Sequence, residues 1–111
     1  MRVYVAGPYS GPTEADRLLN VQRACEVGYE LLLRGHNPFI PHLTHFFEEW
    51  AAEHRQGLSY EEYMRWDESW LTVCDALYYI GSSPGADIEL EVARSYGLLV
   101  FESMEDVPAY D

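Results

Sequence analysis

The 111-residue chain contains no lysine, and its seven arginines face 19 acidic residues, which gives a formal net charge of −12. Duplex DNA, RNA backbones and anionic membranes all attract basic surfaces. The charge therefore argues against nucleic acid and against a membrane as partners. A small molecule held by a few well-placed groups remains compatible with it.

Long hydrophobic runs are also lacking. No apolar stretch approaches the roughly 18–20 residues that cross a bilayer, and Met1 leads directly into a strand-like run without the features of a signal peptide. The only two cysteines, Cys25 and Cys74, lie in apolar helical patterns, which indicates reduced thiols rather than a disulfide. We expect a cytoplasmic protein with a single domain over residues 1–111.

Segments with strand and helix periodicity alternate along the chain. Strands are predicted at 2–7, 37–40, 75–81 and 98–103, and helices at 13–35, 41–57, 59–74 and 82–97. Thr13 with Asp16, and Ser59 with Glu62, have the spacing of capping boxes. The alternation predicts an α/β fold: a small doubly wound, flavodoxin- or Rossmann-like parallel sheet of about four to five strands flanked by helices.

The segments after the first three strands are rich in Gly, Pro, Ser and His. They are GPYSGP (7–12), PHLTH (41–45) and GSSPG (81–85). In doubly wound folds, ligands bind beyond the carboxyl ends of the strands, near the point where the strand order reverses. We therefore expect the binding site to lie among these three loops.

Two acidic residues occupy apolar faces of predicted helices. At about 100° per residue, Glu89 falls inside the apolar arc of its helix, whereas Asp87 and Glu91 lie on the polar side. Asp67 likewise falls between Tyr63 and Trp70. A carboxylate that faces a core is costly unless it is paired or lines a cavity. A shared cavity would give the paired acids of glycosidic cleavage; a core ion pair, or an error in helix register, is the alternative explanation.

In a shared cavity, we expect the two carboxylates to lie about 5–8 Å apart. We expect the apolar surroundings of Asp67 to raise its pKa, and the helix dipole to keep Glu89 ionised.

Three motifs in this order resemble the nucleoside 2-deoxyribosyltransferase superfamily, which includes the 2′-deoxynucleoside 5′-phosphate N-hydrolases. They are VYVAGPY, DESWLTVCDALYYI and SPGADIELEVA. The resemblance implies that Glu89 is the nucleophile, that Asp67 is the catalytic aspartate, and that Tyr4 borders the sugar and orients Glu89. The residues expected to bind the substrate are Gly7, Pro8, Tyr9, His42, Ser83 and Gly85.

The resemblance implies cleavage of the N-glycosidic bond of 2′-deoxynucleosides or their 5′-monophosphates through a covalent deoxyribosyl–glutamate, with the sugar passed to another base or to water. The base, the acceptor and the need for a 5′-phosphate stay open. A non-catalytic nucleotide-binding or sensor module on the same scaffold, and a structural subunit, are the alternatives, because a fold does not dictate function.

Other chemistry finds little support. Ser10 and Ser82 lack the context of a nucleophile elbow, and GPYSGP lacks the ending of a phosphate-binding loop. The spacing of His42 and His45 is compatible with metal ligands, but pocket lining is the favoured interpretation, so we expect neither a metal nor a cofactor.

The many aromatic residues, 14% of the chain, predict a homodimer or larger symmetric oligomer. We expect its contacts on the helical segments 42–55 and 60–72. We also expect the polar tail, residues 104–111, to lie on a neighbouring subunit, with Tyr110 covering that neighbour's pocket.

Overall fold

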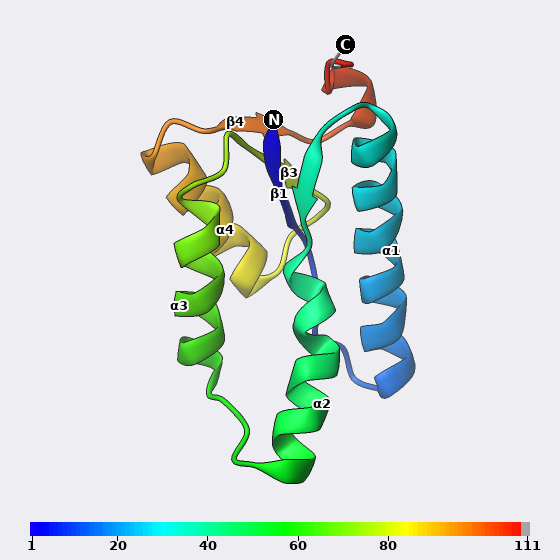
Figure 1. Ribbon diagram of the computed structural model, residues 1–111, viewed down its shortest axis with the longest axis vertical. Coiled ribbons are helices and arrows are strands. Elements are labelled where there is room, and N and C mark those ends of the chain that lie inside the picture. Colours follow the sequence, from blue (N-terminus) through cyan, green and yellow to red (C-terminus); the bar gives the residue numbers. More distant parts are fainter. Residues whose placement is uncertain (110–111) are drawn as a thin grey trace.

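The computed structural model describes residues 1–109 and confirms the predicted α/β class (Figure 1). Within these residues, four parallel strands form one sheet in the order β2-β1-β3-β4. The strands are β1 (Arg2–Ala6), β2 (Asn37–Phe39), β3 (Ala76–Tyr79) and β4 (Leu99–Phe101). The helices are α1 (Glu14–Leu33), α2 (Thr44–His54), α3 (Tyr60–Leu71) and α4 (Pro84–Ser95), with short 3₁₀ turns at Pro41–Leu43 and Met104–Asp106.

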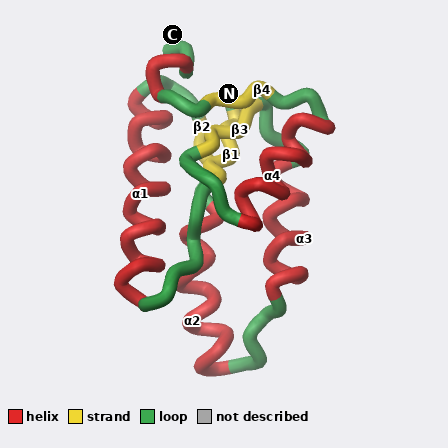
Figure 2. The backbone as a smooth tube through the Cα atoms, turned by 180° about the vertical axis from the view of Figure 1, so that it is seen from behind, coloured by secondary structure: helices red, strands yellow, loops and turns green. Residues whose placement is uncertain are grey.

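The sheet is covered on both faces, and β1 supplies side chains to each. Val3 and Val5 point toward α1, in a core cluster with Ala24 and Leu31. Tyr4 and its neighbour Ala6 point the other way, into a second cluster to which α3 and α4 contribute. Figures 1 and 2 show α1 on one side of the sheet and α3 and α4 on the other. This alternation follows from the two-residue period of a strand.

Local sequence signals set the helix boundaries. Both predicted capping boxes are present, at Thr13 for α1 and at Ser59 for α3. Gly35 and Gly97, which follow α1 and α4, adopt φ values of 87° and 74°. This left-handed conformation is readily available only to glycine, which explains why the helices end there.

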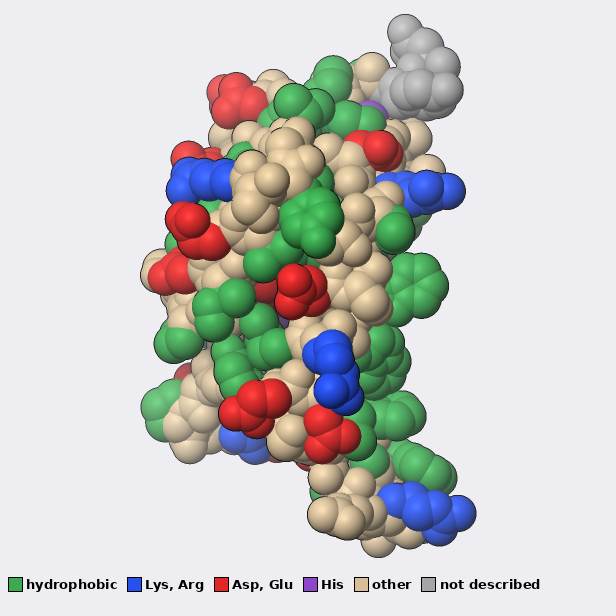
Figure 3. All heavy atoms as spheres, turned by 90° about the vertical axis from the view of Figure 1, so that its left-hand side faces the viewer, with side chains coloured by type: hydrophobic (Ala, Val, Ile, Leu, Met, Phe, Trp, Pro, Cys, Tyr) green, Lys and Arg blue, Asp and Glu red, His purple; other side chains and the backbone are tan. Residues whose placement is uncertain are grey.

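Helices α2 and α3 extend away from the sheet toward the far end of a molecule that measures 43 × 27 × 22 Å (Figures 1 and 2). Several large side chains on them are exposed: Phe46, Phe47, Trp50, Tyr60 and Trp70. Figure 3 faces the side formed by α3 and α4, where hydrophobic groups lie among acidic ones. These exposed groups are compatible with the predicted oligomer, which stays a prediction.

The tail differs from the sequence-based expectation. Val107 is 1% exposed and packs into the cluster under α1. Arg34 Nη1 donates to the Val107 carbonyl at 2.9 Å, and His36 Nε2 donates to the Pro108 carbonyl at 2.5 Å. Residues 104–108 therefore lie on their own chain, held by the buried Val107 and by these two hydrogen bonds. Contact of the tail with a neighbouring subunit stays a prediction. Tyr110 lies outside the described residues.

Within residues 1–109, no helix combines the length and the apolar character needed to cross a bilayer.

Candidate active site

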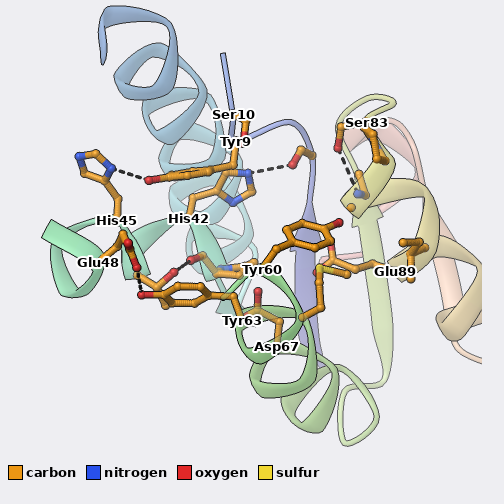
Figure 4. A pocket seen from close by; sticks show the side chains of 18 of the residues that line it. Tyr9, Ser10, His42, His45, Glu48, Tyr60, Tyr63, Asp67, Ser83 and Glu89 are labelled. Atoms are coloured by element: carbon orange, nitrogen blue, oxygen red, sulfur yellow. Dashed lines mark hydrogen bonds between the residues drawn. The ribbon is translucent and has the colours of Figure 1, made fainter. Parts of the chain in front are cut away.

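A cavity of about 680 Å³ lies beyond the carboxyl ends of β1 and β3 (Figure 4). Strand β2 follows β1 on one side of the sheet, whereas β3 and β4 lie on its other side, so the strand order reverses between β1 and β3. The cavity thus occupies the position that this topology favours for ligands. Its lining comes from the loop after β1, the first 3₁₀ turn, α2, α3 and the first turns of α4.

Glu89 and Tyr4 meet at the buried end of this cavity. The Tyr4 side chain is fully buried, and its hydroxyl donates a hydrogen bond to Oε2 of Glu89. Burial, followed by the charges of Glu89 and Asp67, raises the pKa of the Tyr4 hydroxyl well above its usual range. The hydroxyl therefore stays protonated and acts as a hydrogen-bond donor to the carboxylate.

Asp67, on α3, lines the same cavity as Glu89. The side chain is partly buried, and its Oδ1 atom is buried and has no hydrogen-bond partner in the part of the chain that the structure describes. Burial raises the pKa of Asp67 to about 7, which confirms the direction expected from its position on an apolar helix face. Asp67 and Glu89 are close enough for their charges to interact; the predicted carboxylate separation of about 5–8 Å stays a prediction.

The pKa of Glu89 is also raised to about 7, mainly by burial and further by the charge of Asp67, while the hydrogen bond from Tyr4 lowers it. The expectation that the helix dipole would keep this pKa low was wrong. Glu89 is the sixth residue of α4 and is 8% exposed. The dipole acts mainly within the first turn, so desolvation dominates. The pKa values of both acids therefore lie close to neutral pH.

The loop after β1 is fixed by contacts with three elements. A Cβ atom at Gly7 would lie 2.8 Å from Cβ of Ile80, so only glycine allows the loops after β1 and β3 to approach this closely. His42 Nε2 donates to the carbonyls of Gly7 and Pro8 at 3.1 and 3.2 Å, and Asn20 Nδ2 donates to the Tyr9 carbonyl at 3.1 Å. Gly7 and Tyr9 line the cavity, whereas Pro8 contributes through its carbonyl.

His42 is oriented by these two carbonyl acceptors. Since Nε2 donates to them, Nδ1 is left as the acceptor, and it is buried without a partner. Burial lowers the pKa of His42, which favours the neutral ring. His42 and Asp67, which both line the cavity, therefore each carry a buried acceptor, Nδ1 and Oδ1, that receives no hydrogen bond from residues 1–109.

The first turn of α4 forms another part of the lining. Oγ of Ser83 accepts the Ala86 N–H at 3.1 Å and so caps the helix. Gly85 faces the Tyr60 hydroxyl, which would lie 3.4 Å from a Cβ atom placed there. The sequence-predicted residues Gly7, Tyr9, His42, Asp67, Ser83, Gly85 and Glu89 thus line one cavity.

The sequence interpretation missed two tyrosine contacts on the wall formed by α2. The Tyr63 hydroxyl donates to Oε2 of Glu48, and the Tyr9 hydroxyl lies 2.6 Å from Nδ1 of His45 (Figure 4). His45 and Glu48 are three residues apart, which places both on one helix face. That spacing was the available signal, but the tyrosines come from distant segments. None of the residues described as lining the cavity is an arginine.

Among residues 1–109, one group of side chains has atoms arranged so that they could hold a metal ion. It consists of Glu14, His45 and Glu49. Only His45 also lines the cavity.

Comparison with known protein families gives a match, and the matched region includes the residues of the candidate site. No curated protein matches the chain. A family model described as "Domain of unknown function (DUF4406)" matches residues 1–102, which include all four strands and both buried acids. The chain therefore belongs to the DUF4406 family.

Proposed function

We propose that this protein cleaves the N-glycosidic bond of 2′-deoxynucleosides or their 5′-monophosphates and transfers the sugar to another base or to water. The observation that carries the proposal is the pair of acids in one cavity, Glu89 held by the Tyr4 hydroxyl and Asp67 with a free buried oxygen. Paired carboxyl groups are the usual catalytic groups for cleaving a bond at an anomeric carbon.

In the first step, an oxygen of ionised Glu89 forms a bond to C1′ of the sugar. The C1′–N bond breaks, and its electron pair leaves with the base. Asp67, protonated, supplies the proton that the departing base requires. With both pKa values at about 7, the state with one proton between the two acids is well populated near neutral pH.

In the second step, water or the nitrogen of a second base attacks C1′. The bond between C1′ and Glu89 breaks, and its electron pair returns to the carboxylate. Asp67, now ionised, takes the proton that the attacking group loses. Tyr4 donates to Glu89 in the free enzyme, which fixes the direction of the carboxylate before the substrate binds.

The unpartnered acceptors support a polar ligand in this cavity. Buried acceptors without donors are rare in folded proteins because each one forfeits a hydrogen bond. Nδ1 of His42 and Oδ1 of Asp67 are both of this kind. The N–H groups of a nucleobase, or the hydroxyl groups of a sugar, are suitable donors for them.

The test is to incubate the protein with a panel of deoxynucleosides and their monophosphates, with and without free adenine, and to follow base release or exchange. A slow, 2′-fluorinated substrate should leave a sugar adduct on the peptide that contains Glu89, detected by mass spectrometry. Glu89→Gln should give no adduct, while the exposed neighbour variant Glu91→Gln should keep it. Saturable binding without base release would favour the binding-module alternative.

A further inference from the structure

Glu14, at the start of α1, and His45 and Glu49, on α2, form a cluster beside the cavity. Nε2 of His45 lies 2.9 Å from Oε1 of Glu49 and 3.5 Å from Oε1 of Glu14. One ligand atom from each residue lies within 4.8 Å of the others. We propose that this cluster binds a divalent cation with the preferences of zinc. The proposal does not depend on the glycosidase function.

The ring of His45 is the main reason for this assignment. The residue is 3% exposed, and its Nε2 atom is buried without a hydrogen-bond partner among the described residues, although two carboxylate oxygens lie close to it. Neither oxygen lies where a ring N–H would bond it with normal geometry. Side chains that bind the same metal ion have this arrangement, because the lone pair of each ligand atom points at the ion and not at the neighbouring ligand.

The other side of the ring has the partner that a ligating histidine requires. Nδ1 of His45 lies 2.6 Å from the Tyr9 hydroxyl. When Nδ1–H donates to that oxygen, the lone pair on Nε2 is free to bind a metal, which is the usual arrangement around a metal-bound histidine. Glu14 is supported in the same manner, since Arg17 Nη2 donates to its Oε2 atom at 2.6 Å and leaves Oε1 facing His45.

The donor set and the spacing both favour zinc over the hard cations. Zinc takes nitrogen and carboxylate ligands at about 2.0–2.2 Å, so tetrahedral ligand atoms lie roughly 3.3–3.6 Å apart. The distances of 2.9 and 3.5 Å between Nε2 and the two oxygens need only a small adjustment. Calcium and magnesium prefer six or more oxygen ligands. Both glutamates are exposed, so water can complete the coordination.

An ion at this position would connect the first turn of α1 to α2. Through Nδ1 of His45 it would also fix the Tyr9 hydroxyl, and Tyr9 lines the cavity. The sequence pattern did not indicate the cluster, because Glu14 is 31 residues from His45 and meets it only in the fold. The ion would thus organise one wall of the cavity and take no part in the chemistry at Glu89.

The proposal is tested on full-length, tag-free protein that has been treated with a chelator. Zinc chloride is titrated by calorimetry, and cobalt(II) serves as a spectroscopic probe of coordination. We expect one saturable site per chain, visible cobalt bands of a low-coordinate nitrogen–oxygen site, and a higher melting temperature with zinc. Glu49→Gln should weaken zinc binding by at least about tenfold.

Glu53→Gln is the matched control, since Glu53 is an exposed acid on the same helix, one turn further on, and should leave zinc affinity unchanged. Tyr9→Phe should weaken binding less than Glu49→Gln. The proposal is overturned if the wild type shows no saturable zinc binding, or if Glu49→Gln binds zinc as the wild type does. It is also overturned if nuclear magnetic resonance shows His45 protonated on both nitrogens and unchanged by zinc.

Discussion

One pair of carboxyl groups, Asp67 and Glu89, lines the cavity, whereas a second pair, Glu14 and Glu49, lies beside it in opposite surroundings. Among residues 1–109, no cation shifts the pKa of Asp67 or Glu89, and burial raises both pKa values to about 7. Glu14 and Glu49 are exposed, and the hydrogen bond from Arg17 lowers the pKa of Glu14. The comparison shows that burial brings the pKa values of the first pair into the range where they exchange protons near neutral pH. In the exposed pair, the hydrogen bond from Arg17 favours the charged form of Glu14, and that charge can attract a cation.

The largest expected effect is on the rate of base release, and it should distinguish Glu89 from its exposed neighbour Glu91. Glu89→Gln should reduce base release by at least about 10³-fold, because the amide is a poor nucleophile. Glu91→Gln should retain wild-type turnover. Both variants should fold, as checked by circular dichroism. Turnover by Glu89→Gln equal to that of the wild type would remove the proposed mechanism.

Asp67→Asn tests the second member of the buried pair. We expect turnover to fall by about 10²–10⁴-fold, the usual contribution of a general acid, with a much smaller change in KM. The wild-type rate should fall at acid pH as Glu89 gains a proton and at alkaline pH as Asp67 loses one. The variant should lose the alkaline limb of this profile. A symmetrical bell retained by the variant would assign that limb to another group.

Tyr4→Phe removes the donor to Glu89 and keeps the ring. A hydrogen bond to a charged group contributes about 1.5–3 kcal/mol, so turnover should fall roughly 10- to 100-fold. Because that hydrogen bond lowers the pKa of Glu89, its loss should move the acid limb of the pH–rate profile to higher pH. An unmoved limb would mean that the Tyr4 contact does not influence Glu89 in solution.

The burial of Glu89 should also make the free energy of unfolding depend on pH. The pKa of Glu89 is raised on folding, so its contribution to the free energy of unfolding is fully present below pH 4.5 and is lost as pH rises to about 7. Glu89→Gln should have little effect on stability at the acid end and should stabilise the protein by about 3 kcal/mol at pH 8, because a shift of one pKa unit corresponds to about 1.4 kcal/mol. Urea denaturation at both pH values, with Glu91→Gln as the control, measures this. Equal effects at both pH values would contradict it.

The smallest effect is expected at the exposed pair. Without metal, Glu49→Gln should change the free energy of unfolding by less than about 0.5–1 kcal/mol, because exposed ion pairs contribute little. With zinc present, the difference between variant and wild type should grow. Thermal melts with and without zinc chloride make this comparison, and a large metal-free effect would show that Glu49 stabilises the fold by itself.

Sequence patterns that extend over only a few residues, such as capping boxes and helix or strand periodicity, predicted much of the fold and part of the site. The two capping boxes and the parallel sheet follow from local spacing. The burial of Glu89 followed from its position on the helix wheel, since only one face of α4 packs on the sheet.

Features that depend on tertiary contacts were not predictable in the same way. The Tyr63–Glu48 contact joins two helices whose separation depends on the loop between them. The raised pKa of Glu89 depends on burial, which propensity and dipole arguments do not measure. The anchoring of the tail depends on the burial of Val107 and on hydrogen bonds from Arg34 and His36, which lie more than 70 positions away in sequence.

The location of Tyr4 has a consequence for heat inactivation. Its ring is part of the interior that holds β1 to α3 and α4, and its hydroxyl points at the proposed nucleophile. The alignment of Glu89 is therefore set when the sheet assembles and needs no later rearrangement. On warming, the geometry at Glu89 should persist until the sheet itself melts, so enzymatic activity and the native fold should disappear together in one cooperative transition.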